Sequence, residues 1–381
     1  SSAPSMQGRT RQPSPGLRNA ELWRDAMAVG LFVAGLLFLW SAMTILPDGR
    51  GWGYDYSAYH AAAERIVATG SPYQPATLEG PFRPGPGGLY LYSPIPALAV
   101  VPLTWLGEDR ATWVFAIGHI ALFVGAALLL PMSRRLRLGV IGIAGLSLVV
   151  IIDVQLGNIS LIVTSLTMIA WRFLDRPAGA IAVALAMTMR PTMGLVLAWW
   201  AIRRRWRPLV WAIGAGALMV LVSLPFVGVR SYLDFVAVLG NLSGVTGVTN
   251  NVDLASSLLG LGLPGPAANA VLYLVYGLAI AAAVLSLRRD RELSFVVVAM
   301  ATLFLSPLMW DHYLTQLLIP AAFLARRGHW WGLLLPLLGW LPALGLKPLL
   351  AVAGLAGLLL PFIARDRGAP AWPSRRSSVP L

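Results

Sequence analysis

Asp55 stands between two tyrosines in a polar, aromatic stretch, Gly51 to Tyr73, which follows the first long apolar run of the chain. A carboxylate held in a partly desolvated pocket can accept a proton from a hydroxyl group as that oxygen attacks a carbon atom. Asp is also a preferred helix N-cap, so the capping of a helix is an alternative role for Asp55. We expect a chemical role, with or without the cap.

Arg190 interrupts an apolar segment and is followed by Pro191, which ends a helix and frees backbone groups around the guanidinium. An arginine in such a place can hold a phosphate through two parallel hydrogen bonds. A side chain that merely reaches the membrane interface is the alternative. Arg83, in the first large polar loop, could equally bind an anion or pair with Glu79.

His312 belongs to the segment Trp310 to Tyr313, which opens an apolar run with an ionisable pair. His312 could donate a hydrogen bond to a phosphate or to an acceptor hydroxyl, while Asp311 could serve only as a helix cap. Polar side chains at membrane depth are costly and usually functional. We therefore count both with the candidate site.

The remaining polar signals are weaker. Asn158 and Asn251 lie in turn-forming segments at the ends of apolar runs, where a structural role is favoured. Tyr92 suits either stacking on a sugar ring or the aromatic belt of a membrane interface. His60 and Glu64 are one helical turn apart, but no third ligand is near, so we expect a solvated helix face and no metal. The residues considered as possible substrate contacts are Tyr54, Tyr56, Tyr92, Asn158, Asn251, Trp310 and Asp311.

The composition is that of an integral membrane protein. Of the 381 residues, 57% are hydrophobic and only 12% are charged, and the mean hydropathy is +0.71. The net charge of +13 comes from arginines in short clusters between apolar runs, which is typical of cytoplasmic loops rather than of nucleic-acid binding. The chain has no cysteine, which excludes disulfides and thiolate metal sites.

The basic clusters also predict the topology. Arg18 and Arg24 precede the first span, Ala26 to Leu46, so we place the N-terminus in the cytoplasm and Asp55 outside. The later clusters fall inside if the short apolar segment from Pro94 to Leu106 does not cross the membrane, and we favour a re-entrant or interfacial helix there. This topology needs about 10–12 membrane segments, several of them short.

One polytopic domain accounts for the chain. We expect a disordered cytoplasmic tail over residues 1–24, a membrane domain over 25–366 and a second cytoplasmic tail over 367–381. An outer loop over 47–93 carries Asp55, and within it Tyr56 to Thr69 has helical spacing with Gly70 and Pro72 as stop signals. A polar outer loop is expected from Arg230 to Asp253.

Five segments together resemble glycosyltransferase family 87. These are GYDYSAYHAAAERIVATGSPY with the following YLYSPIPALAVVPL, GNIS at Gly157 to Ser160, MRP at Met189 to Pro191, and SPLMWDHYLTQLLIPA at Ser306 to Ala321. Each motif alone is weak, but their shared order makes the set fairly specific. Tyr313 replaces a second histidine of the family pattern, and Arg190 replaces its usual lysine, which keeps the charge and changes the geometry.

The resemblance implies a GT-C fold and an inverting transfer without cofactor or metal. It assigns Asp55 as the catalytic base and His312 to the active site or donor phosphate, and Arg190 and Arg83 join the phosphate candidates. The donor would be a polyprenyl-phosphate sugar, mannose by first choice and arabinose as the alternative. The acceptor would be a glycolipid or glycan on the outer face of the bacterial plasma membrane, with membrane lipids as surroundings and no nucleic acid. A flippase or transporter of lipid-linked sugars and a non-enzymatic scaffold remain the rivals from other classes.

Overall fold

The computed structural model describes residues 15–45, 51–79, 89–242, 251–306 and 308–364. In these ranges the regular structure is helical, with no strand and one isolated β-bridge between Asn251 and Trp310. The first half of the chain forms α1 (Pro15–Ile45), α2 (Tyr54–Thr69), α3 (Pro75–Leu78), α4 (Pro94–Val100), η1 (Val101–Leu106), α5 (Glu108–Leu129), α6 (Arg134–Leu146), α7 (Leu148–Leu156), α8 (Ser160–Arg172) and α9 (Pro177–Met189). The second half forms η2 (Pro191–Gly194), α10 (Leu195–Ile202), α11 (Trp206–Leu242), α12 (Leu254–Gly260), α13 (Gly265–Ser286), α14 (Arg291–Phe304), η3 (Asp311–Leu317), α15 (Leu318–Arg326), η4 (Trp330–Leu344) and α16 (Leu349–Ile363).

Four of the described helices are long and apolar enough to span a membrane, namely α1, α5, α11 and α13. The pair α6 and α7, bent by 67°, makes a fifth if it is one broken span. Six further apolar stretches of 10–17 residues include Pro94–Leu106. The predicted class, an all-α polytopic membrane protein, is confirmed, while the 10–12 crossings stay a prediction.

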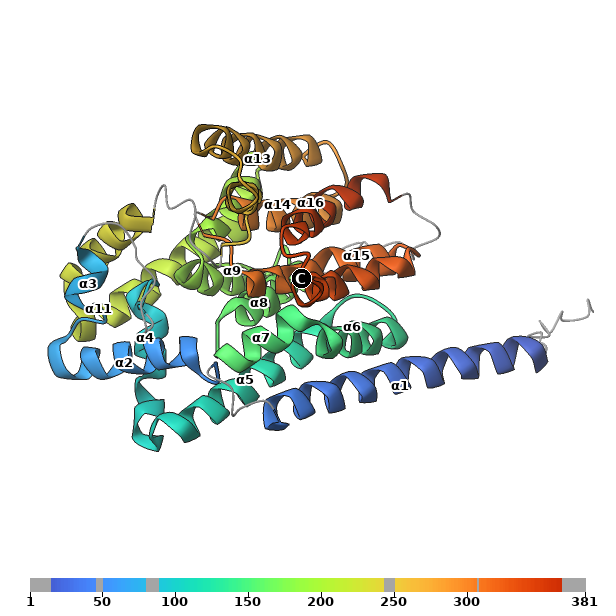
Figure 1. Cartoon of the computed structure of the whole chain (residues 1–381), viewed down its shortest axis with the longest axis horizontal. Helices are drawn as coiled ribbons and strands as arrows, with labels where there is room; N and C mark the ends of the chain where they lie inside the picture. The colour runs from blue at the N-terminus through green and yellow to red at the C-terminus, as the bar shows by residue number, and fades with distance from the viewer. Residues whose placement is uncertain (1–14, 46–50, 80–88, 243–250, 307, 365–381) are drawn as a thin grey trace, which may run out of the picture.

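The long helices surround a buried centre. Only 17–33% of the most apolar window of each long helix is buried, which leaves apolar faces for lipid. In contrast, nearly every residue of α14 and of α15 is buried. Figure 1 shows α1 along one flank and α13 along the opposite flank, with α8 and α15 between them.

Glycines let α1 and α6 pack backbone to backbone. A Cβ atom at Gly35 would overlap the carbonyl oxygen of Gly142, and one at Gly145 would overlap the carbonyl oxygen of Gly35. Small residues allow this close approach between membrane helices, which gain van der Waals contact from it. An ion pair between Asp25 and Arg135 joins the same two helices. α1 begins at Pro15, inside the segment predicted as a tail.

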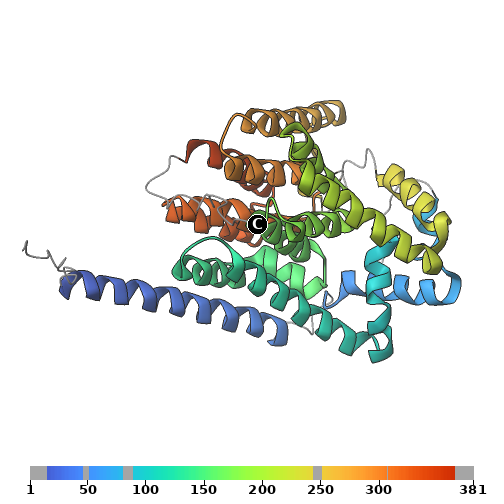
Figure 2. The same cartoon turned by 180° about the vertical axis from the view of Figure 1, so that it is seen from behind.

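α11 is longer than the sequence pattern predicts, and it bends at Gly228, whose φ of 64° suits glycine (Figure 2). Helix resumes beyond the bend, where Arg230 donates a 2.9 Å hydrogen bond to Asp234 four residues later. Ser231 also donates to the carbonyl of Gly70, at the end of α2. The prediction of a polar loop from Arg230 is therefore wrong for Arg230 to Leu242; residues 243–250 lie outside the described ranges.

Basic loops and the segment that carries Asp55 lie at opposite ends of the molecule. Asp175 pairs with Arg205 and Arg291, and Arg327 pairs with Asp290. These ion pairs join four loops at one end, namely α8–α9, α10–α11, α13–α14 and α15–η4. α8 begins at Ser160 and ends at Arg172 beside these loops, so its length, about 20 Å, separates them from Ser160. α2, α3 and α4 lie at the end remote from the start of α1 (Figure 1).

Candidate active site

The start of α2 is docked on the end of α7. Gly53, with φ of 70°, precedes the helix, and its N–H donates a 2.7 Å hydrogen bond to the carbonyl of Gln155. Gly53 is the N-cap, so Asp55 lies inside the first turn and does not cap it. The capping alternative for Asp55 is therefore wrong. A carboxylate in this turn still gains from the positive end of the helix dipole.

Asn158 meets Asp55 across this contact. Its Nδ2 donates a 2.8 Å hydrogen bond to Oδ2 of Asp55. The approach depends on Gly157, which has φ of 67° and no room for a Cβ atom, since that atom would lie 2.7 Å from Cβ of Tyr56. Asn158 is 2% exposed, so its role exceeds that of a surface turn former.

Arg190 points into the protein rather than toward the interface. It follows α9 in an extended conformation and is 5% exposed. Its guanidinium donates to Oε1 of Gln316 at 2.7 Å and to Oγ of Ser160 at 3.1 Å, and it lies over the Tyr313 ring at 4.1 Å from the centroid. A guanidinium has five N–H donors, so these two bonds leave others for a ligand. The alternative of an arginine that reaches out to the interface is wrong.

His312 brings an unsatisfied ring nitrogen to the same region. The imidazole is buried, stacked on Trp310 and edge-on to Tyr313, and its Nδ1 lies 3.3 Å from Oδ1 of Asp311. Its Nε2 is buried without a hydrogen bond in the described part of the chain. Buried polar atoms are nearly always paired, so an unpaired nitrogen suggests a missing partner. Asp311 accepts the backbone N–H of His312 at 2.8 Å, and the N-cap of η3 is Trp310.

Electrostatic interactions link these groups. Burial raises the pKa of the Asp55 carboxyl above its ordinary value of 3.8, and the nearby Asp311 charge adds to the rise. The positive charge of a protonated His312 and the hydrogen bond from Asn158 act in the opposite direction. Burial also raises the pKa of the Tyr92 hydroxyl well above 10, with further contributions from Tyr313 and Asp55. Asp55, Asn158, Arg190 and His312 thus share one site, together with Tyr92.

The other residues predicted to contact the substrate lie in different environments. Arg83 lies outside the described residues. Tyr54 is 39% exposed, whereas Tyr56 is fully buried against Phe115. Asn251 has a structural position, because its Oδ1 accepts the N–H of Met309 at 3.0 Å and fixes the chain before Trp310. Trp310 and Asp311 lie beside His312 as described above.

Two residues of the site, Ser160 and Gln316, were not considered individually from the sequence. Ser160 and Gln316 hold Arg190, and Gln316 in turn donates to Thr302 at 3.2 Å. Asp153, which the sequence places at the outer end of a membrane segment, is fully buried. Its Oδ2 accepts the N–H of Leu161 at 3.0 Å, and its Oδ1 has no hydrogen-bond partner among the described residues. The signal that could have found Gln316 is its polarity inside an apolar run, four residues after His312.

The pair of His60 and Glu64 does not form a solvated face. Nδ1 of His60 and Oε1 of Glu64 are 3.7 Å apart, but His60 is buried beside Tyr56 and Glu64 is largely exposed. The expectation was wrong for His60 because the aromatic ring of Tyr56, one turn earlier, packs against it. Within the described ranges, no three His, Asp or Glu side chains are grouped as a metal site would need.

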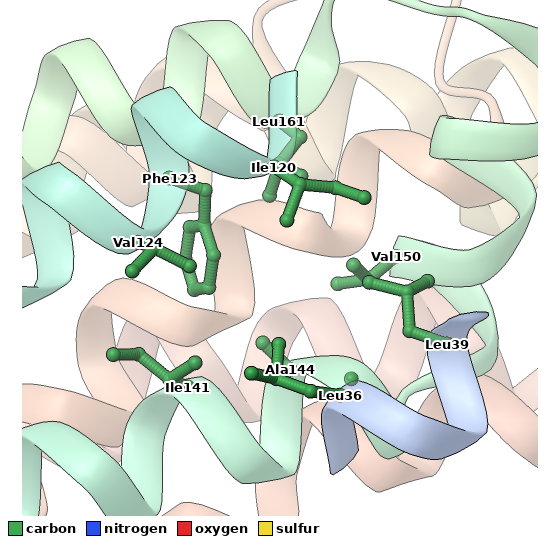
Figure 3. A pocket seen from close by; sticks show the side chains of 10 residues that line it. Leu36, Leu39, Ile120, Phe123, Val124, Ile141, Ala144, Val150 and Leu161 are labelled. Atoms are coloured by element: carbon green, nitrogen blue, oxygen red, sulfur yellow. The ribbon is translucent and has the colours of Figure 1, made fainter. Parts of the chain in front are cut away.

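A small apolar pocket lies between α1, α5, α6, α7 and α8 (Figure 3). Leu36 and Leu39 of α1 face Phe123 and Val124 of α5 across it, and Leu161 lines it from α8. Its volume, about 10 Å³, is room for a single water-sized group, and its apolar wall gives water no partners. It is a packing gap and no substrate site.

The model of glycosyltransferase family 87 matches residues 90–309, more than half of the chain. The chain belongs to glycosyltransferase family 87. This confirms the resemblance, and the protein is a membrane glycosyltransferase. Asn158 and Arg190 lie within the matched residues, while Asp55 and His312 lie outside them. No curated protein and no solved structure matches the chain.

Proposed function

We propose that the protein transfers a sugar, mannose by first choice, from a polyprenyl-phosphate carrier to a glycolipid or glycan acceptor, with inversion at the anomeric carbon. One observation carries the proposal. Among the described residues, a carboxylate with one oxygen that accepts no hydrogen bond shares a site with a buried guanidinium and a histidine nitrogen that has no partner, and the chain belongs to a glycosyltransferase family.

Asp55 is the base in this reaction. It takes the proton of the acceptor hydroxyl as that oxygen bonds to the anomeric carbon, and the bond from this carbon to the phosphate oxygen breaks. The electron pair of that bond stays with the polyprenyl phosphate, which leaves as an anion. Because burial raises the pKa of Asp55 above that of a free aspartate, its carboxylate is the stronger base.

Arg190 and His312 suit the leaving phosphate. The remaining N–H donors of the Arg190 guanidinium can meet phosphate oxygens, and Nε2 of His312 can do so when it carries a proton. Charge fixed in a buried site stabilises the charge that develops on the leaving group. Arg83 stays a candidate for the same phosphate.

The active site is proposed to face the outer side of the bacterial plasma membrane, with both termini in the cytoplasm. The support is the distribution of charge. The basic loops lie at the far end of α8 from Ser160, and arginine-rich loops prefer the cytoplasm.

A transfer assay tests the function. Purified protein is incubated with a crude envelope lipid extract and radiolabelled polyprenyl-phosphate mannose or, separately, polyprenyl-phosphate arabinose. We expect a labelled product with inverted anomeric configuration from one donor. Transfer from a nucleotide sugar with none from either lipid donor, or retention of configuration, would overturn the proposal; transfer from arabinose alone would correct the sugar.

A further inference from the structure

The side-chain amide of Asn158 has only one possible orientation. Its Oδ1 accepts the backbone N–H of Ser160 at 3.0 Å and the Ser160 hydroxyl at 2.8 Å. A backbone N–H can only donate, so Oδ1 must face Ser160 and Nδ2 must face Asp55. The assignment of oxygen and nitrogen in this amide follows from the hydrogen bonds.

Ser160 is fixed in turn by Arg190. The Ser160 hydroxyl donates to Asn158 and accepts the 3.1 Å hydrogen bond from the Arg190 guanidinium. Arg190 is held by Gln316, which also donates to the carbonyl of Ala299 in α14. These hydrogen bonds form one continuous chain, called the relay below, which runs from the buried helix α14 to the carboxylate of Asp55. Its side chains all have low exposure; they are Gln316, Arg190, Ser160 and Asn158.

The relay occupies one oxygen of Asp55. Oδ2 accepts the Asn158 donor, whereas Oδ1 makes no hydrogen bond with the described residues. We propose that Asn158 is a positioning residue, which holds the Asp55 carboxylate in one orientation with Oδ2 occupied, so that Oδ1 receives the proton of the acceptor hydroxyl. The inference rests on the proposed function, since it concerns the same reaction.

Removal of the Asn158 donor has a second effect. The hydrogen bond to the ionised carboxylate lowers the pKa of Asp55, so its loss raises that pKa further. The substitution does not alter the other titratable groups that interact with Asp55, which are Tyr59, Tyr92, Asp153, Asp311, His312 and Tyr313.

The test compares Asn158→Ala, Asn158→Asp and the control Asn241→Ala. Asn241 donates to the carbonyls of Thr77 and Leu78 and has no part in the relay. We expect Asn158→Ala to lower kcat about 10- to 100-fold with an unchanged KM for the donor, because small misplacements of a reacting group have effects of this size. In a plot of kcat against pH, the fall in activity on the acid side (the acid limb) should move to higher pH. Asn241→Ala should match the wild type in both.

Asn158→Asp is the control for misfolding of Asn158→Ala. An aspartate has the same side-chain volume and can still accept both hydrogen bonds from Ser160. Its ionised carboxylate would face Asp55, so the acid limb should move further than in Asn158→Ala. A wild-type kcat and an unmoved acid limb in the two Asn158 variants would overturn the positioning role.

A measurement of Asp55 protonation needs no sugar transfer, so it tests the role of Asn158 independently of the proposed function. The protonation of Asp55 can be followed by infrared difference spectra between the wild type and Asp55→Asn over a pH titration. We expect a higher midpoint when Asn158→Ala is introduced. If no lipid-linked sugar is transferred, the function fails but this midpoint still tests Asn158; an equal midpoint overturns the positioning role even if transfer is found.

Discussion

Asn158 donates a 2.8 Å hydrogen bond to Asp55, a residue 103 positions earlier in the chain. The contact joins α2 to the loop between α7 and α8, and it gives the carboxylate a defined direction. The first consequence concerns Asp55 itself. Replacement of Asp55 by Asn preserves shape and removes the base, so transfer should fall by about 10²- to 10⁴-fold. Product formation under initial-rate conditions measures it.

The matched control for Asp55→Asn is Glu64→Gln, which neutralises an exposed carboxylate on the same helix. It should keep full activity. Both variants should elute from a sizing column as the wild type does. Substantial transfer by Asp55→Asn would contradict the assignment of the base.

The pH dependence of transfer follows from the environment of Asp55. Burial raises its pKa above 3.8, and only the ionised form can accept a proton, so activity should fall as the pH drops through that raised pKa. A protonated His312 lowers the pKa of Asp55, hence His312→Gln should move the acid limb of kcat/KM to higher pH. A limb at lower pH in this variant would show that His312 does not act on Asp55 as a positive charge.

Gly157 should be intolerant of a side chain. In Gly157→Ala the new Cβ atom would lie 2.7 Å from Cβ of Tyr56, and the backbone would keep a positive φ. We expect α2 to shift and transfer to fall about 10²-fold, since the distance between Asn158 and Asp55 would change. Gly345→Ala is the control, because Gly345 has the same left-handed conformation but has open space around it. Equal activities of the two variants would mean that backbone strain, and not the contact with Tyr56, matters.

The packing of α1 on α6 gives a prediction for stability. Gly35→Ala places a methyl group against the backbone of Gly142, and overpacking of this kind costs about 1–3 kcal/mol. The midpoint of thermal unfolding in detergent should fall accordingly. Gly30→Ala, in the same helix with nothing near its Cβ, should be neutral or slightly stabilising. A neutral Gly35→Ala would mean that the two helices can separate without loss.

Orientation in the membrane can be tested because the chain has no natural cysteine. Glu64→Cys places a thiol at an exposed position of α2, and Arg204→Cys places one at an exposed position of the loop between α10 and α11. The cells have an intact plasma membrane, and any envelope layers outside it have been removed. A membrane-impermeant maleimide should then label Glu64→Cys but not Arg204→Cys. After permeabilisation, both should react. Labelling of Arg204→Cys alone in intact cells would reverse the proposed orientation.

Local features were predictable from the sequence where local rules decide them. The Ala-rich spacing before Gly70 predicts α2, which ends at Thr69 with Gly70 in the left-handed conformation. A polar residue that interrupts an apolar run points to Arg190, and an ionisable pair that opens a run points to His312. For Asn158, in contrast, the sequence favoured the structural role of a turn residue. The family resemblance added the chemical role of Asp55.

Features that depend on distant packing were not predictable. The partners of Arg190 lie 30 and 126 positions away, so no spacing rule relates them. The helix beyond Gly228 reads as a polar loop because its stabilising contacts include the carbonyl of Gly70, far back in the chain. His60 packs against Tyr56, which in turn packs against Phe115 of α5, so this cluster also depends on a distant segment of the chain.

The relay has a consequence for biogenesis. Its members are synthesised in the order α2, the α7–α8 loop, the α9–η2 junction and η3, so Gln316 comes last among them. Until η3 is inserted, the guanidinium of Arg190 lacks its closest hydrogen-bond acceptor, in a lipid environment where an unpaired charge is costly. A nascent chain that stops before η3 therefore carries Asp55 but lacks the contact between Arg190 and Gln316, so the proposed site is incomplete until η3 has been made.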